Sequence, residues 1–186
     1  GPDRPSKRAR ADLLALALTM ALLEGGERVG LAGQPPRPGR AQIVALANGL
    51  ADSAEDYGLP DATGLVPHGR AVFLSDFLGP LEGLETALTF AADRGVRGVL
   101  VQVLDPAEEE FPFTGRTVFQ SMGGTMSHET QSAAALRDRY LARLAERKDR
   151  LATLARAVGW HSACHHTGTP AQTALLWAYQ ALEGGR

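Results

Sequence analysis

Continuous apolar runs alternate along this chain with segments whose apolar residues recur every three or four positions. The runs at 70–76 and 96–104 have the length and composition of buried strands, and helical periodicity lies between and around them. Strands that are apolar on both faces and joined through helices are typical of a parallel sheet with helices on either side. The sequence therefore predicts an α/β fold with a doubly wound, mostly parallel sheet.

The expected elements follow one another without an internal repeat. Helices are expected at 6–24, 41–53, 80–93, 132–158 and 170–182, and strands at 28–32, 70–76, 96–104 and 160–165. Pro106 and Pro112 interrupt this order, and residues 116–120 are expected to form an extra edge strand or a hairpin. Residues 13–23 are apolar on nearly every side, so their helix is expected to be mostly buried between the sheet and other helices.

Composition and charge narrow the classes of function. The chain has 186 residues, which suits one domain spanning 1–186, and its net charge of −2 gives no electrostatic argument for nucleic-acid binding. Its one cysteine, Cys164, cannot form an internal disulfide, so we expect a cytoplasmic location. The apolar run at 13–23 is shorter than the roughly 18 residues typical of a membrane span, so we expect no membrane insertion by this segment.

Ser75 and Asp76 end the expected strand at 70–76, where doubly wound folds bind their ligands. Asp105 ends the next strand in the same way. A carboxylate in that position must be exposed, hydrogen-bonded or beside a cation, because burying it alone costs several kcal/mol. One interpretation gives Asp76 a structural role, bonded to free N–H groups near Gly79 and Pro80 at the start of a helix. The other makes it a metal ligand in a longer protein.

The stretch HSACHH contains three histidines and a cysteine, which are zinc-type ligands. In an extended strand His161 and His165 share one face, while Cys164 and His166 share the other, so the four do not converge. We therefore favour a buried cysteine with histidines at the rim. A cysteine nucleophile would need a histidine within hydrogen-bond reach and a third, orienting group, which the sequence does not identify.

Three stretches together carry a family resemblance. The strand end LSDF, the later VQVLDPAEEEFPFTGRTVF and the closing TGTPAQTALLWAYQAL resemble the bacterial domain of unknown function 58 family. The resemblance implies a domain similar to the von Willebrand factor A fold. Genes of that family commonly lie beside those of MoxR-type AAA+ ATPases, so it also implies a partner or adaptor of such an ATPase. We therefore expect no enzymatic activity and no catalytic residue.

The von Willebrand factor A fold builds a metal-ion-dependent adhesion site from three loops, and this chain matches only part of it. Asp76 matches the aspartate of the third loop, Thr63 offers the only match for the threonine of the second, and Ser75 supplies a further hydroxyl. The Asp-x-Ser-x-Ser loop is lacking. The resemblance therefore implies a domain that is incomplete at its N-terminus, as the C-terminal part of a longer protein. We expect no cofactor in this chain and Mg²⁺ only in the intact protein.

Phe111 and Phe113 flank Pro112 after an acidic run, and two interpretations remain open for them. They are either a docking element for a partner or aromatic residues that fold back over the sheet edge.

Two alternatives to an interaction domain also remain open. One is a doubly wound enzyme that uses Asp76 in phosphoryl-type chemistry, with Asp105 as a second carboxylate. It would need a lysine at a strand end, and Lys7 and Lys148 are expected elsewhere. The other is a purely structural domain.

Overall fold

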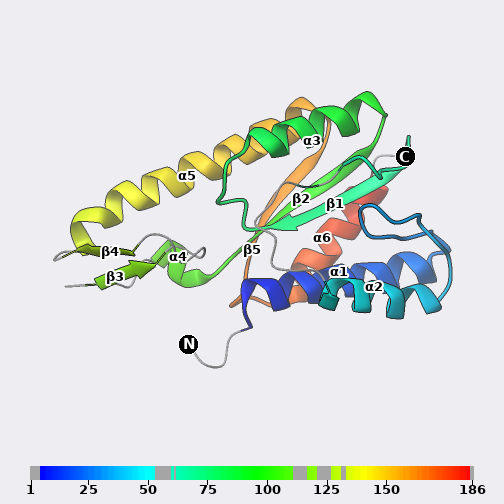
Figure 1. Cartoon of the computed structure of the whole chain (residues 1–186), viewed down its shortest axis with the longest axis horizontal. Coiled ribbons are helices and arrows are strands. Elements are labelled where there is room, and N and C mark those ends of the chain that lie inside the picture. Colours follow the sequence, from blue (N-terminus) through cyan, green and yellow to red (C-terminus); the bar gives the residue numbers. More distant parts are fainter. Residues whose placement is uncertain are drawn as a thin grey trace.

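The sheet has three strands, β1 (Arg70–Ser75), β2 (Arg97–Leu104) and β5 (His161–His166). The computed structural model describes residues 5–52, 60, 62–110, 117–120, 127–130 and 133–184. Within them the strand order is β1-β2-β5 and both pairings are parallel. Helices lie on both faces of the sheet (Figure 1). The expectation of an α/β fold with a parallel sheet is confirmed.

In the described residues four long helices cover the two faces of this sheet, and a fifth packs against one of them. One face is covered by α3 (Glu82–Asp93) and α5 (Ala133–Ala157), and the other by α1 (Lys7–Glu24) and α6 (Ala171–Glu183). The remaining helix, α2 (Ala41–Asp52), packs against α1 (Figure 1). These helices begin and end close to the positions that the sequence predicts.

The central strand, β2, contributes to the core on both faces. Val99, Val101 and Val103 pack toward α1 and α6, while Leu100 packs toward α3 and α5. All four are buried, because successive side chains of a strand point to opposite faces and helices cover both. This explains why the strand reads as a continuous apolar run.

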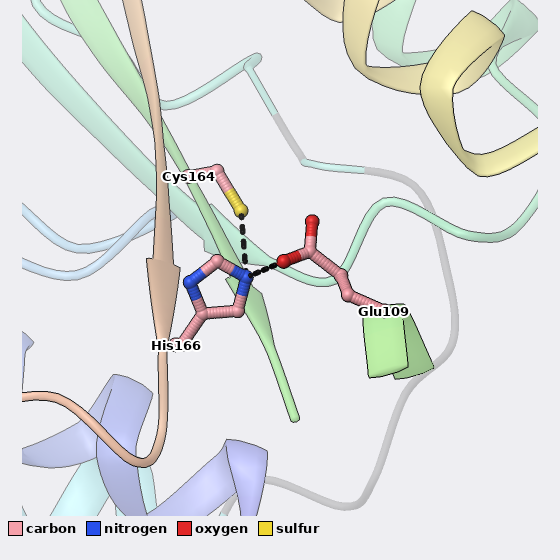
Figure 2. Close-up of side chains that lie close together, drawn as sticks. All are labelled: Glu109, Cys164 and His166. Carbon is pink, nitrogen blue, oxygen red and sulfur yellow. Dashed lines mark hydrogen bonds and ion pairs between the residues drawn. The ribbon is translucent and has the colours of Figure 1, made fainter. Parts of the chain in front are cut away.

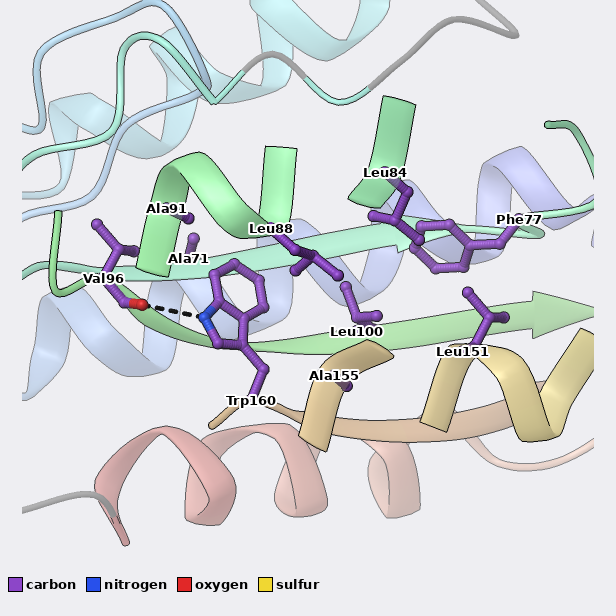
Figure 3. Close-up of a cluster of buried hydrophobic side chains, with 10 residues drawn as sticks. All are labelled: Ala71, Phe77, Leu84, Leu88, Ala91, Val96, Leu100, Leu151, Ala155 and Trp160. Atoms are coloured by element: carbon purple, nitrogen blue, oxygen red, sulfur yellow. Dashed lines mark hydrogen bonds between the residues drawn. The ribbon is translucent and has the colours of Figure 1, made fainter. Parts of the chain in front are cut away.

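Trp160 anchors the core beneath α3 and α5 (Figure 3). Its indole Nε1 donates a 3.0 Å hydrogen bond to the Val96 carbonyl, and its ring centroid lies 5.1 Å from that of Phe73. A buried tryptophan is favourable when its N–H finds an acceptor in this way. The bond connects the residue before β5 to the residue before β2, and so fixes the amino ends of the two strands together.

Between β2 and α5 the described residues form three short elements. Helix α4 (Pro106–Glu110), which the sequence analysis does not predict, follows β2 directly. Strands β3 (Thr117–Gln120) and β4 (Ser127–Thr130) then pair antiparallel. The expectation of an extra strand or hairpin near 116–120 is thus confirmed.

The expected strand at 28–32 is wrong. Val29 forms a single isolated antiparallel bridge with Arg37, and the Gln34 N–H donates to the Leu31 carbonyl to close a turn between them. The segment therefore finds its hydrogen-bond partners locally and does not join the parallel sheet.

The helix that contains residues 13–23 is less buried than expected. Leu14, Leu18 and Thr19 are buried, but Leu13 is 52% exposed and Met20 is 45% exposed. Among the described elements α1 packs against β1, β2, α6 and α2, which cover part of its circumference.

None of the helices in the described part of the chain combines the length and the apolar character needed to cross a membrane.

Candidate functional site

The carboxyl ends of β1, β2 and β5 form one edge of the sheet, which we call the carboxyl edge. Asp76 and Asp105 directly follow β1 and β2, and His166 ends β5. Charged residues from three helices join them there. They are Lys7 of α1, Glu108 and Glu109 of α4, and Lys148 of α5.

Lys7 bridges two carboxylates at the carboxyl edge. Its Nζ donates 2.8 Å hydrogen bonds to Asp76 Oδ2 and to Glu108 Oε1. Ser6 places it there by capping α1, since its side chain accepts from the Ala9 N–H at 3.1 Å. Burial by itself lowers the pKa of Lys7, but the two hydrogen bonds and the two negative charges outweigh it, so the pKa is raised above 10.5. The side chain therefore stays an ammonium at neutral pH.

Asp76 also fixes the turn that follows β1. Its Oδ1 accepts a 3.1 Å hydrogen bond from the Leu78 N–H, and Ser75 Oγ accepts from the Phe77 N–H at 3.1 Å. Phe77 has a positive φ of 50°, which these side-chain bonds help to hold. Helix α3 begins only at Glu82 and has no side-chain cap. Asp76 is therefore a turn-forming residue paired with Lys7, and its interpretation as the cap of that helix is wrong.

Asp105 has a structural role of the same kind. Its Oδ1 accepts from the Ala107 N–H at 2.8 Å, while Glu108 Oε2 accepts from the Asp105 N–H at 2.8 Å. This reciprocal pattern is a capping box, and it starts α4. Asp105 Oδ2 accepts from the Thr167 hydroxyl at 3.3 Å. Both oxygens of Asp76, of Asp105 and of Glu108 thus accept a bond from within the chain.

The structure does not place Thr63 beside Asp76. The 62–69 loop leads into the amino end of β1, where the His68 N–H donates to the Arg94 carbonyl. Gly64, next to Thr63, lies so close to Gly33 that a Cβ would come within 2.6 Å of its nitrogen. Asp76 lies beyond the other end of this six-residue strand, which is about 20 Å long.

The two aromatic residues proposed for partner docking, Phe111 and Phe113, lie outside the described residues.

A second cluster lies at the end of β5 (Figure 2). His166 Nε2 is 2.5 Å from Glu109 Oε2 and 3.9 Å from Cys164 Sγ. Lys148 forms an ion pair with Glu109. Partial burial raises the pKa of the Cys164 thiol although Lys148 lowers it, and partial burial together with Lys148 lowers the pKa of His166.

The burial expected for the HSACHH stretch is wrong in two places. Cys164 is exposed, whereas His165 is 5% exposed. His165 points to the opposite face of β5, where its Nδ1 lies 3.3 Å from the Thr169 hydroxyl. The side chains of this strand alternate between its two faces as expected, but His165 is the buried residue and Cys164 is not.

This cluster does not have the geometry of a cysteine nucleophile with an oriented base. In such an arrangement one ring nitrogen faces the thiol and the other faces the orienting acid. Here Cys164 and Glu109 both approach Nε2 of His166 (Figure 2). One nitrogen cannot accept the thiol proton and be held by the carboxylate at the same time.

A cleft of about 240 Å³ lies between α5 and the sheet beside this cluster. Cys164 and Lys148 line it together with Gln102 and Phe77. Gln102 is nearly fully buried and donates a 2.8 Å hydrogen bond to the Asp76 carbonyl, which fixes this wall of the cleft.

Sequence reasoning missed the residues that reach the carboxyl edge from the helices. The capping box of Asp105 and Glu108 has a readable signal, an aspartate followed three residues later by a glutamate. The statement that neither lysine lies near a strand end is wrong, because Lys7 contacts Asp76 and Lys148 contacts Glu109. No local signal marks these two contacts, since they depend on how distant segments pack.

Comparison with known proteins gives one family and three relatives. The model of the family described as "Protein of unknown function DUF58" matches residues 1–150. An uncharacterized protein of Mycobacterium bovis and uncharacterized proteins of two Mycobacterium tuberculosis strains are each 33% identical to this chain over 91 residues. That match covers 49% of this chain and 28% of each relative, so it spans less than a third of the relatives' length. No solved structure gives a significant match.

Proposed function

We propose that this chain, which belongs to the DUF58 family, is a non-catalytic protein-interaction domain. In this proposal its sheet is von Willebrand factor A-like and its partner is a MoxR-type AAA+ ATPase. The proposal includes a cytoplasmic location, because the single Cys164 allows no internal disulfide.

The observation that carries the proposal is the bonding of the carboxylates at the carboxyl edge. A general base or a nucleophile needs a carboxylate oxygen that is free to reach the substrate. Both oxygens of Asp76 are engaged by Lys7 and Leu78, and both oxygens of Asp105 and Glu108 are engaged as well. This arrangement favours a structural use of these groups over a chemical one.

The same bonding supports the absence of a tightly held Mg²⁺ at Asp76 in this chain. Mg²⁺ requires close to six oxygen ligands and gives up its water reluctantly. The Lys7 ammonium already lies where a cation would neutralise Asp76 and Glu108. A longer protein that contains the Asp-x-Ser-x-Ser loop is proposed to bind Mg²⁺ through Asp76 and Ser75 by displacing Lys7.

The proposal of a MoxR-type partner rests on the family's gene neighbourhood. Two surfaces are offered for the contact. One is the segment with Phe111 and Phe113. The other is the exposed face of α1, where Leu13 and Met20 lie seven residues apart and so point the same way.

One specific observation supports the alternative function, an enzyme that uses Asp76 in phosphoryl-type chemistry. Phosphoryl-type chemistry with Asp76 requires a nearby lysine, and Lys7 Nζ lies 2.8 Å from Asp76 Oδ2. Binding of a phosphate analogue such as beryllofluoride or vanadate, abolished in Asp76→Asn, would favour this enzyme over the interaction domain.

The proposed function is tested with a purified MoxR-type AAA+ ATPase. The immobilised wild-type chain should retain the ATPase, and Asp76→Asn should retain it equally. Replacing Phe111 and Phe113 by alanine, or Leu13 and Met20 by lysine, should identify which surface is used. Val66→Lys is the matched control, since Val66 is similarly exposed, at 49%, in the loop that precedes β1. Failure of the wild type to retain the ATPase would contradict the proposed partner.

A further inference from the structure

We propose that Glu109, Cys164 and His166 form a zinc-binding site. This inference goes beyond the interaction role proposed above and does not depend on it. It also departs from the expectation that this chain binds no cofactor. The argument rests on where the three donor atoms lie, on their chemistry, and on the elements that hold them.

The three donor atoms converge on one small volume. Glu109, Cys164 and His166 each offer one ligand atom, and all three atoms lie within 4.8 Å of one another. A tetrahedral Zn²⁺ with its usual bond lengths needs nitrogen–oxygen and nitrogen–sulfur separations of roughly 3.4 and 3.6 Å. The corresponding separations here are 2.5 and 3.9 Å. Side-chain shifts of about 1 Å or less would bring all three atoms to bonding distance.

The donor set favours Zn²⁺ over the hard cations. A thiolate and an imidazole suit zinc, whereas Mg²⁺ and Ca²⁺ take oxygen ligands almost exclusively. The carboxylate of Glu109 is the third ligand type found in zinc sites. Figure 2 shows the thiol and the carboxylate both directed at the same ring nitrogen. In a hydrogen-bonded cluster Nε2 of His166 can bond to only one of the two groups. A metal ion placed between the three donor atoms could bond to all of them.

The fold holds these residues in place from two sides. Cys164 and His166 are two positions apart on β5, so both point to the same face of the sheet. Glu109 is brought to that face by α4, whose first turn is fixed by the capping box and by the contact of Glu108 with Lys7. Ligands supplied by such fixed elements need little reorganisation on binding.

Lys148 opposes the binding of a cation at this site. Its ammonium pairs with Glu109 and interacts with Cys164. Its long stem allows it to leave when a metal ion takes its place, but that exchange lowers the affinity. Removing this charge should therefore strengthen zinc binding, an effect that a purely structural role of the cluster would not produce.

Three protein ligands leave one position of a tetrahedral ion open. We assign it to a water molecule. Because Cys164 also lines the 240 Å³ cleft, the ion would lie at the cleft wall. It would join α4 to β5 and thereby stabilise the folded chain.

The test is titration of Zn²⁺ into the metal-free wild-type chain by calorimetry, with Co²⁺ as a spectroscopic probe. We expect one ion per chain and a thiolate-to-cobalt absorption band that Cys164→Ser removes. Cys164→Ser, His166→Ala and Glu109→Gln should each weaken zinc binding by at least the roughly 10- to 100-fold typical of changes around a metal site. Lys148→Met should tighten it. Zn²⁺ should also raise the melting temperature of the wild type, and EDTA should reverse this.

His161→Ala is the matched control, because His161 is an exposed histidine of the same strand that points to the opposite face. Its zinc affinity should equal that of the wild type. Circular dichroism of each metal-free variant checks that the fold is retained. The proposal is overturned if the wild type binds Zn²⁺ no more tightly than Cys164→Ser, or if His161→Ala weakens binding as much as His166→Ala.

Discussion

The Lys7 ammonium lies 2.8 Å from the Asp76 carboxylate, although the two residues are 69 positions apart in the chain. This contact, together with that of Lys7 to Glu108, joins the first helix to the loops that follow β1 and β2. Arg10 strengthens the connection by donating to the Thr167 carbonyl, after β5, at 2.8 Å. The amino-terminal turn of α1 therefore contacts the carboxyl ends of all three strands of the sheet.

Lys7→Met should destabilise the chain. It keeps the aliphatic stem but leaves Asp76 and Glu108 near each other without a cation. The side chains of Lys7 and Asp76 are 23% and 30% exposed, so solvent screens part of the effect. We expect the free energy of unfolding to fall by about 1–2 kcal/mol, between the values for exposed and buried pairs. Urea unfolding at pH 7 measures it.

Arg40→Met is the control for this substitution. Arg40 and Glu24 also form an ion pair, but at 3.8 Å and with side chains 85% and 67% exposed. Its loss should change the free energy of unfolding by less than about 0.5 kcal/mol. Equal effects of the two substitutions would mean that the Lys7 bridge contributes no more than a surface pair.

The contribution of Lys7 should depend on pH in the alkaline range. Burial lowers its pKa, but the hydrogen bonds and charges of Asp76 and Glu108 outweigh burial and raise it above 10.5. A raised pKa in the folded state means that the stabilisation is fully present below 10.5 and is lost as pH rises through the folded-state value. The stability difference between wild type and Lys7→Met should therefore be constant from pH 7 to about 10 and shrink above that. A difference that grows with pH over that range would contradict the assigned bridge.

The sequence predicts the elements of this fold well where their signals are local. The apolar runs of β1 and β2 and the capping serine of α1 can be read directly, and all three are observed. The segment at 28–32 fails because a short run of mixed residues does not reveal its partner. Its single bridge goes to Arg37 rather than to the sheet.

The candidate sites could be predicted only in part. Strand alternation correctly puts Cys164 and His166 on one face of β5, but Glu109 comes from a helix 55 positions away from Cys164 that the sequence analysis does not predict. Likewise the strand-end position of Asp76 can be read from the sequence, whereas its partner Lys7 cannot. Contacts between distant elements depend on packing, which has no signature in local periodicity.

Two leucines of α1 test whether only one face of this helix is buried. Leu18 is 5% exposed and packs with Val99, Val101 and Val103, whereas Leu13 is 52% exposed. Leu18→Ala should lower the free energy of unfolding by about 2–5 kcal/mol, because it removes buried methyl groups and leaves a cavity. Leu13→Ala, with the same change of side chain, should cost less than about 1 kcal/mol. Similar losses in urea unfolding would mean that α1 is covered on both of these faces.

Gly98→Ala should be among the most damaging substitutions in the core. A Cβ on Gly98 would lie 2.2 Å from the Ala71 carbonyl oxygen and 2.8 Å from the Trp160 ring. The first neighbour is backbone of the paired strand β1, and the second is a buried ring that is hydrogen-bonded to the Val96 carbonyl. Neither can move away without disrupting the strand pairing or this hydrogen bond. We expect a loss of about 3 kcal/mol or more, the upper end of the range for overpacked cores.

Gly79→Ala separates this steric effect from the general effect of replacing a glycine. Gly79 has no heavy atom within 4 Å of the added Cβ and no positive φ, so the substitution should change stability by less than about 1 kcal/mol. Both variants are compared by urea unfolding, with the fluorescence of Trp160 and Trp177 as the probe of the two sides of the core. If Gly98→Ala proves as stable as Gly79→Ala, then β1, β2 and Trp160 are not packed as closely as this structure has them.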